Sequence, residues 1–365
     1  MLATARQGLI AGIAVCCLQA AAQTPAGYPA SYADIVAAAR REGKVVVYST
    51  TDRSVAAPLN RAFEEQYPGI KVEYREMDSA ILDRRVIAEA KAGPRSGADV
   101  VWSLAMDRQF KLVNDGFAQP YRSPEASRLP DWAKWKDEAY GTTFEPIGFI
   151  YNERQLRKDE VPQTHADLVR LLKQQGARFK GKVTTYDVER SGVGFLLATQ
   201  DSRAMSGFWT LVQLLGAAGA RLEENSAPMM EAVGSGTALI GYNVIGSYAM
   251  ARAEMDPSIA VVLPSDYTLV LSRVAFVLRN ASDPNAAKLW LDFVLSQRGQ
   301  SVLATKSGLA SVRNDLTGPH SAKALAQSLG PALRPITIGP SLLVYLDRAK
   351  EQEFTRQWRE TAAPR

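Results

Sequence analysis

The chain has 365 residues and a formal net charge of +5, from 43 lysine and arginine residues against 38 aspartate and glutamate residues. Charges of both signs are spread along the chain without a long basic block, so no nucleic-acid-binding surface is expected. The length exceeds what one hydrophobic core normally supports, so two lobes are expected.

The first residues have the pattern of an export leader. Arg6 is followed by the apolar run from Leu9 to Leu18 and by Ala20-Ala21-Ala22, which predicts a signal peptide over residues 1–22, cleaved near Ala22. Both cysteines, Cys16 and Cys17, fall inside it, so the mature chain would have no disulfide and no thiolate metal site. A lipoprotein anchored through one of them is the alternative, but no small residue directly precedes Cys16.

The first structured unit of the mature chain reads as strand, loop, helix and strand. Val45–Tyr48 is a continuous apolar run, typical of a strand covered on both faces. An apolar residue at every fourth position then predicts an amphipathic helix, and residues 70–74 return as a strand. The polar loop Ser49–Ser54 therefore lies where a strand ends and a helix begins, a place where open α/β sheets bind ligands and where anions are favoured.

Alternation of strands and helices continues to residue 141. Ile81–Ala92 and Met106–Asp115 are predicted helices, and Val100–Trp102 is a predicted strand between them. Such alternation is typical of an α/β fold with a parallel sheet that is covered on both faces.

Several of these segments resemble one family. The opening unit, Ala98-Asp-Val-Val-Trp-Ser103, Pro146-Ile-Gly-Phe-Ile-Tyr-Asn152 and Val274-Ala-Phe-Val-Leu278 are similar to the periplasmic solute-binding proteins of bacterial ABC transporters, in the branch of the ferric-ion-binding proteins. The resemblance covers roughly residues 43 to 313. It implies a two-lobed, Venus-flytrap fold, with two hinge crossings and a cleft that closes on a small solute.

The resemblance also implies how the chain divides. A segment near Gly141–Asn152 would cross into the second lobe, and Thr268–Leu278 reads as a strand long enough to cross back. We expect lobe one to comprise residues 30–142 and 275–340, and lobe two to comprise residues 143–274. Residues 341–365 are predicted to form a C-terminal helix, with its amphipathic part over Ser341–Arg359.

Candidate ligand contacts are polar residues in loops that follow predicted strands. Helix capping is the alternative role for the hydroxyl and carboxylate side chains among them. In lobe one the candidates are Ser49, Thr50, Thr51, Asp52, Ser79 and Ser103, and in lobe two they are Tyr186, Asp187, Ser191, Gly192, Tyr242, Asn243 and Tyr248.

Arg273 is a further candidate because Ser272-Arg273 interrupts an otherwise apolar strand. A buried guanidinium is costly unless it is paired. Its partner is expected to be the anionic group of a ligand, or alternatively a structural carboxylate such as Asp52 or Asp187.

Nothing in the chain predicts an enzyme. The two histidines, His165 and His320, lie in polar segments without an obvious partner and are expected at the surface. No nucleophile elbow, phosphate-binding loop, zinc motif or dinucleotide fingerprint is present, and no cofactor is predicted. An exported hydrolase therefore stays a weak alternative.

The candidate residues favour an organic anion over a metal ion. Ferric-binding relatives hold iron with adjacent tyrosines, whereas Tyr242 and Tyr248 are separated here, and ferric iron requires several anionic oxygens. Hydroxyls, an amide and one arginine suit a carboxylate, phosphate or phosphonate. We therefore expect a monomeric periplasmic protein that binds a small anionic solute and delivers it to an inner-membrane ABC permease, with ferric-ion binding as the alternative.

Overall fold

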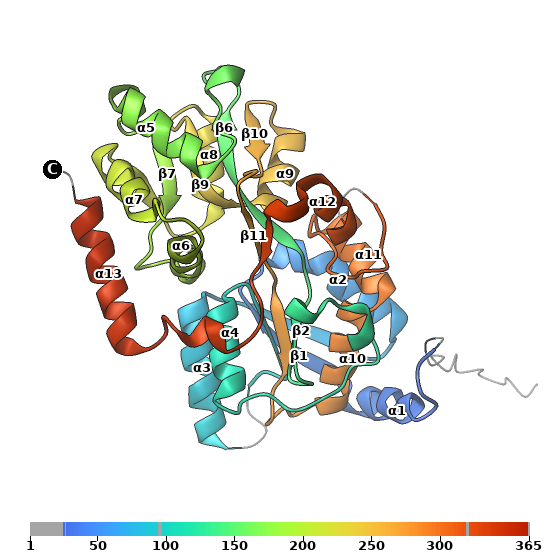
Figure 1. Ribbon diagram of the computed structural model, residues 1–365. Coiled ribbons are helices and arrows are strands. Elements are labelled where there is room, and N and C mark those ends of the chain that lie inside the picture. Colours follow the sequence, from blue (N-terminus) through green and yellow to red (C-terminus); the bar gives the residue numbers. More distant parts are fainter. Residues whose placement is uncertain (1–24, 26, 94–96, 319–320, 364–365) are drawn as a thin grey trace, which may run out of the picture.

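The computed structural model describes residues 25–365, except residues 26, 94–96, 319–320 and 364–365. The predicted signal peptide and His320 lie outside the described residues. Two sheets form the centres of two lobes, with helices packed around each sheet (Figure 1). The predicted two-lobed α/β fold is confirmed.

Lobe one is built on a six-stranded sheet in the order β2-β1-β3-β12-β5-β4. Its first three strands are parallel, as the alternation of elements predicted, and β12 is antiparallel to β3. The strands are β1 (Lys44–Ser49), β2 (Lys71–Glu76), β3 (Val100–Ser103), β4 (Lys134–Trp135), β5 (Ala139–Gly141) and β12 (Val274–Val277). The helices are α1 (Tyr32–Glu42), α2 (Arg53–Gln66), α3 (Ser79–Ala92), α4 (Met106–Asn114), α10 (Pro284–Leu295), α11 (Gln297–Lys306) and α12 (Ala322–Leu329).

Lobe two is built on a seven-stranded sheet in the order β13-β11-β6-β9-β7-β8, with β10 paired to β6. Its strands are β6 (Glu145–Asn152), β7 (Val183–Tyr186), β8 (Arg221–Glu223), β9 (Ile240–Ile245), β10 (Ile259–Val262), β11 (Thr268–Leu271) and β13 (Leu333–Pro335). Its helices are α5 (His165–Phe179), α6 (Gly192–Ala204), α7 (Phe208–Ala217), α8 (Ser226–Gly234) and α9 (Gly246–Met255). Short 3₁₀ turns occur at Ala126–Arg128, Asp131–Ala133, Lys158–Glu160 and Gly330–Ala332.

Two short segments carry the chain between the sheets around the junction of the lobes, and the chain enters the second sheet once more at β13. The first separates β5 from β6 at residues 142–144, and the second separates β11 from β12 at Ser272 and Arg273. The predicted single strand Thr268–Leu278 is therefore two strands, because the chain changes sheets where the apolar run is interrupted. The crossing segments lie side by side, since the N–H of Thr142 donates to the carbonyl of Arg273 at 2.9 Å.

The C-terminal region differs from the predicted helix over Ser341–Arg359. A 3₁₀ turn, η5 (Pro340–Leu343), packs against α4 of lobe one, and helix α13 (Arg348–Ala362) packs against α7 of lobe two. Asp347 begins the helix because its carboxylate accepts a hydrogen bond from the N–H of Lys350 at 3.2 Å.

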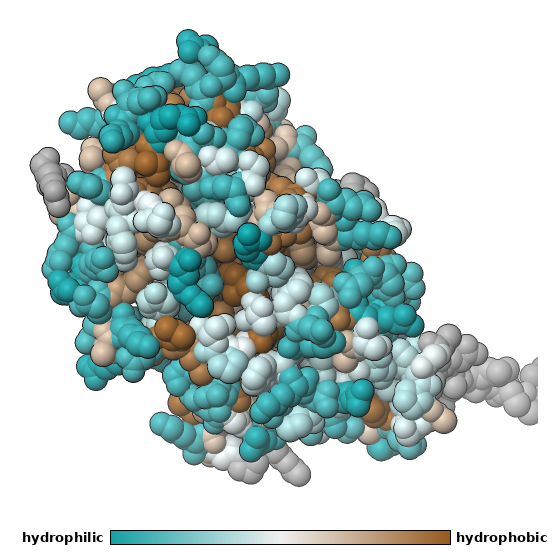
Figure 2. Space-filling view, viewed as in Figure 1, coloured by the Kyte–Doolittle hydropathy of each residue, from teal (hydrophilic) through white to brown (hydrophobic). Residues whose placement is uncertain are grey.

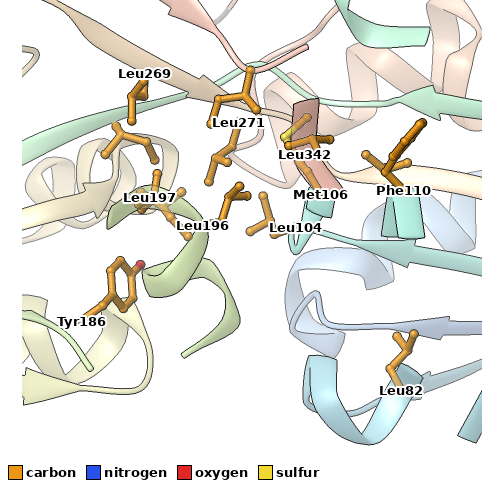
Figure 3. Close-up of a cluster of buried hydrophobic side chains, with 14 of the residues drawn as sticks. Leu82, Leu104, Met106, Phe110, Tyr186, Leu196, Leu197, Leu269, Leu271 and Leu342 are labelled. Atoms are coloured by element: carbon orange, nitrogen blue, oxygen red, sulfur yellow. The ribbon is translucent and has the colours of Figure 1, made fainter. Parts of the chain in front are cut away.

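Apolar side chains from both lobes meet near the crossings. Figure 3 shows Leu104 and Met106 of lobe one beside Leu196 of α6, with Leu271 and Leu342 close by. All five residues are buried and belong to one cluster. Burial of this kind stabilises contact between the lobes, at roughly 25 cal/mol for each Å² of apolar surface removed from water.

The face of the molecule seen in Figure 2 is mostly hydrophilic. Figure 2 shows polar side chains over most of the visible face, with small hydrophobic patches between them. Among the residues that the structure describes, no helix is long and apolar enough to cross a membrane.

Two buried polar groups lie away from the interlobe surface. In lobe one, Asp292 of α10 accepts hydrogen bonds from the hydroxyls of Tyr32 at 2.9 Å and Tyr121 at 2.6 Å. In lobe two, His165 is buried, stacks on Tyr267 and has its Nδ1 2.9 Å from an Asp266 carboxylate oxygen. The prediction of a surface position for His165 is wrong, because the packing of α5 against distant residues 266–267 is not visible in the local sequence.

Candidate functional site

The polar loops of lobe one hold one another in place. The hydroxyl of Thr50 donates to the hydroxyl of Ser103 at 3.0 Å, and the N–H of Thr51 donates to the hydroxyl of Ser49 at 3.0 Å. Ser49, Thr51 and Ser103 are buried, whereas Asp52 is exposed at the start of α2. The structure thus brings the ends of β1 and β3 together as the sequence suggested, but the hydroxyls of Ser49, Thr50 and Ser103 make hydrogen bonds within these loops.

Arg273 lies at the junction of the two lobes and is fully buried. Its Nη1 donates to the hydroxyl of Thr51 at 2.6 Å, and its Nη2 donates to the hydroxyl of Tyr248 at 2.9 Å. Its Nη2 also donates to Glu145 Oε2 at 3.1 Å. The Nε atom is 2.9 Å from Glu145 Oε1, but its N–H is not aligned with that oxygen, so this contact is ionic only.

Glu145 completes this buried network. Its carboxylate also accepts hydrogen bonds from the hydroxyls of Thr143 at 2.7 Å and Ser247 at 2.8 Å. Burial raises the pKa of Tyr248 to about 12, although the nearby Arg273 acts in the opposite direction, so the phenol is neutral at physiological pH. In this structure Arg273 is therefore paired with a structural carboxylate, the second of the two partners considered from the sequence. That carboxylate is Glu145, not Asp52 or Asp187.

Tyr242 and Asn243 lie within strand β9, whereas the sequence suggested a loop after a strand ending at residue 241. The hydroxyl of Tyr242 and the side-chain N–H of Asn243 both donate to Asp201 Oδ2 at 2.5 Å. Tyr267 donates to the other oxygen of Asp201 at 2.8 Å. Both predicted contacts thus bind a buried carboxylate within lobe two, and the pKa of Tyr242 is raised well above 10 by burial and by Asp201.

The remaining lobe-two candidates have local partners as well. The hydroxyls of Tyr186 and Ser226 are 2.6 Å apart, and Asp187 accepts hydrogen bonds from the N–H groups of Glu189 and Arg190. The hydroxyl of Ser191 accepts from the N–H of Gly194 at 3.1 Å, so it caps α6. Helix capping, the alternative role for such residues, is confirmed for Ser191.

A cavity of about 490 Å³ lies between the lobes. Three of the predicted residues, Ser79, Ser191 and Gly192, are in its wall. The rest of the wall consists of residues from lobe one, from the loop before α6, from α6 itself and from α13: Ala80, Arg108, Val188, Glu189, Arg190, Phe195, Glu351, Gln352, Thr355 and Arg359.

The lobes come very close at one point of this wall. A Cβ atom added at Gly192 would lie 2.8 Å from the hydroxyl oxygen of Ser79 and 3.4 Å from Nε of Arg108. The first residues of α3 and α6 are therefore neighbours across the cavity, together with the guanidinium of Arg108. Asp78, which precedes α3, makes no side-chain hydrogen bond to the first turn of that helix.

Arg108, Arg190 and the α13 residues were missed by the sequence prediction. Arg108 lies in the first turn of α4, five residues after the candidate Ser103, and could have been found by extending each loop into the next helix. No pattern in the sequence indicates that α13 contributes to the cavity wall, since its position beside α6 depends on tertiary packing.

The comparisons with known proteins agree with this architecture. Residues 59–327 match the model of the bacterial extracellular solute-binding protein family. The chain belongs to this family. It is 36% identical to the substrate-binding protein of an ABC transporter from Agrobacterium tumefaciens, with a TM-score of 0.82 over 87% of this chain and 94% of that one.

Solved structures with lower sequence identity share the fold. The periplasmic binding protein AfuA from Actinobacillus pleuropneumoniae, with fructose-6-phosphate bound, is 19% identical, with a TM-score of 0.70 over 88% of this chain and 99% of that one. Iron-bound HitA from Pseudomonas aeruginosa is 18% identical, with a TM-score of 0.67 over 87% and 99% of the two chains. As a family member, this protein is the solute-binding component of an ABC transporter, a class that works with a membrane permease.

Proposed function

We propose that this protein captures a small organic anion, a carboxylate, phosphate or phosphonate, in the cavity between its lobes and delivers it to the permease of an ABC importer. The main support for this proposal is that the first turns of α3 and α6 and the side chain of Arg108 lie next to one another in the wall of one cavity. Free N–H groups and the helix dipole favour an anion at a helix N-terminus. No covalent chemistry is required, because closure of the two lobes is sufficient to hold the solute.

The charges around the cavity support this assignment. Arg108 is paired with Asp83 at 3.4 Å. This contact is long, and the guanidinium has further N–H groups that can donate to a second anionic partner. Arg190 adds a second cation to the wall, although Glu224 is its ion partner. Arg359 is engaged by both carboxylate oxygens of Glu189.

Ferric-ion binding is less well supported by the positions of the tyrosines. Tyr242 is buried on Asp201 and Tyr248 is bound to Arg273, and the pKa of each phenol is raised. Ferric binding by tyrosine needs the phenolate, which these surroundings disfavour. Among the described residues, no group of three or more histidine, cysteine, aspartate or glutamate side chains is placed to hold a metal ion.

Titration calorimetry with a panel of anions tests the proposed function. We expect binding, with one site per chain, of at least one of six probes: inorganic phosphate, fructose 6-phosphate, phosphoethanolamine, acetate, gluconate and β-alanine. A protein that binds none of them but turns red with ferric salts, and loses the colour when Tyr242 or Tyr248 is replaced by phenylalanine, would support iron transport instead. Sustained turnover of p-nitrophenyl phosphate or p-nitrophenyl acetate would contradict the absence of catalysis.

Replacement of Gly192 by valine should weaken binding of that probe. Side-chain atoms at this position would press against Ser79 and Arg108 when the lobes meet, and overpacking costs roughly 1–3 kcal/mol, or about 5- to 150-fold in affinity. Gly176→Val is the matched control, since a Cβ at Gly176 meets nothing within 4 Å. Equal affinities for the two variants would show that this contact is not part of the binding state.

The exported and monomeric state is proposed on the sequence pattern and on family membership. We expect the mature protein to begin after Ala22 and to elute as a single chain. N-terminal sequencing of the periplasmic fraction and light scattering check these two points, and an intact leader or a stable dimer would contradict them.

A further inference from the structure

Helix α13 is fixed to lobe two by aromatic packing. Phe354 lies 5.7 Å from Phe195 of α6 and 6.2 Å from Phe208 of α7, measured between ring centroids. Trp358 is also 6.2 Å from Phe208, and both α13 residues are buried. At its far end, Arg359 donates two hydrogen bonds to the carboxylate of Glu189. The helix is therefore part of lobe two by its packing.

The segment before α13 is fixed to lobe one. Leu342 of η5 is buried in the same apolar cluster as Met106 and Phe110 of α4. Residues 344–347 then pass from lobe one to lobe two, where Tyr345 and Leu346 pack against the aromatic cluster of α6, α7 and α13. This passage is separate from the crossings at residues 142–144 and 272–273. Figure 1 shows α13 running along the side of lobe two that is next to α6.

The two sides of α13 have different environments. Glu351, Gln352, Thr355 and Arg359 are in the wall of the interlobe cavity. The other side, with Lys350, Glu353, Phe354 and Gln357, lines a separate groove against Trp209. One helix thus presents a glutamate and a glutamine to each environment.

Glu351 is distinct among the carboxylates of the cavity wall. The other carboxylate of the wall, Glu189, is bound by Arg359. The side chain of Glu351, in contrast, makes no hydrogen bond or ion pair with any residue that the structure describes. An ionised carboxylate accepts hydrogen bonds and cannot donate them. At short range it repels an anion and attracts a hydroxyl or an ammonium group.

We propose that α13 forms a third wall of the solute site, in which Glu351 and Gln352 contact the solute. The solute then carries an anionic group, for the first turns of α3 and α6, and a hydrogen-bond-donating group, a hydroxyl or an ammonium, for Glu351. This inference rests on the proposed function and adds a second chemical requirement to it. The wall lies beyond residue 327, where the match to the family model ends.

Matched substitutions on the two sides of α13 test the proposal. Glu351→Gln and Gln352→Ala alter the cavity side, and Glu353→Gln and Gln357→Ala make the same changes on the opposite side. Affinity is measured by calorimetry for the two anions without a second donor, inorganic phosphate and acetate. It is also measured for the hydroxyl-bearing probes, fructose 6-phosphate and gluconate, and for the ammonium-bearing probes, phosphoethanolamine and β-alanine. Thermal unfolding is recorded for every variant.

We expect the wild-type protein to prefer a probe with a second donor. Glu351→Gln should weaken binding of that probe about tenfold or more, and Gln352→Ala about fivefold, with both controls near wild type. Binding of phosphate or acetate should stay the same or become tighter in Glu351→Gln, because a negative charge is removed. Whether the hydroxyl or the ammonium series responds identifies the donor.

Two results would overturn the proposal in different ways. If the wild-type protein binds a probe but the cavity-side variants match their controls, α13 does not contact the solute and the proposed function still stands. If the wild-type protein binds none of the six probes, the proposed function fails and the third wall fails with it. Unchanged unfolding temperatures in all four variants exclude misfolding as the cause of any loss.

Discussion

Arg273→Ala should lower the free energy of unfolding by about 3–5 kcal/mol, because it leaves Glu145 buried without its cationic partner. Both side chains are fully buried, so solvent cannot replace the lost contact. Thr51 and Tyr248 lose a hydrogen-bond donor in the same change. Urea denaturation of the two proteins at pH 7 measures the difference.

The affinity of the folded variant separates the two roles considered for Arg273. The guanidinium is absent from the residues that line the interlobe cavity, so the calorimetric affinity of Arg273→Ala for its best probe should stay within a few fold of wild type. A variant of normal stability that binds ten- to a hundredfold more weakly would instead show that Arg273 contacts the ligand, as the sequence suggested.

A second replacement checks the reason for the loss of stability. Exchange of a buried ion pair for apolar residues of similar volume is often neutral or favourable, whereas removal of one partner is costly. The double variant Arg273→Met with Glu145→Leu should therefore recover much of the stability that Arg273→Ala loses. Failure to recover it would indicate that the hydrogen bonds from Thr143 and Ser247 to Glu145 contribute more than the ion pair.

The protein should become less stable as pH rises from about 4 to 7, in part because of Asp292. Burial raises the pKa of this carboxyl to about 7, whereas an unfolded aspartate has a pKa near 3.9. In this window the folded chain keeps a proton that the unfolded chain releases, so the free energy of unfolding falls with pH. At about 1.4 kcal/mol for each pKa unit, the contribution reaches roughly 4 kcal/mol at pH 7 and above.

Asp292→Asn isolates this contribution. The amide does not ionise, so the variant should lose several kcal/mol less than wild type between pH 4.5 and pH 8 in urea denaturation. Asp131→Asn is the control, because Asp131 is 99% exposed and its ion pair with Lys134 is at the surface. Parallel pH profiles for wild type and Asp292→Asn would show that Asp292 is ionised in the folded protein.

The order of the elements was determined by the sequence because the signals are local. The apolar run at Val45–Tyr48 and the helical periodicity that follows it lie within about twenty residues of each other, and the structure has β1, α2 and β2 in these places. The interruption at Ser272-Arg273 marked the place where the chain changes sheets, because a charged residue cannot continue a buried apolar strand without a partner.

The partners of the polar residues were decided only by the tertiary structure. Arg273 pairs with Glu145, 128 residues away, and Tyr242 binds Asp201, 41 residues away. No local periodicity encodes which distant side chain meets a buried donor, so the sequence indicated that Arg273 needs an anion but not which anion. The same applies to α13: its amphipathic pattern predicted a helix, whereas its place in the cavity wall follows from the packing of Phe354 and Trp358 against lobe two.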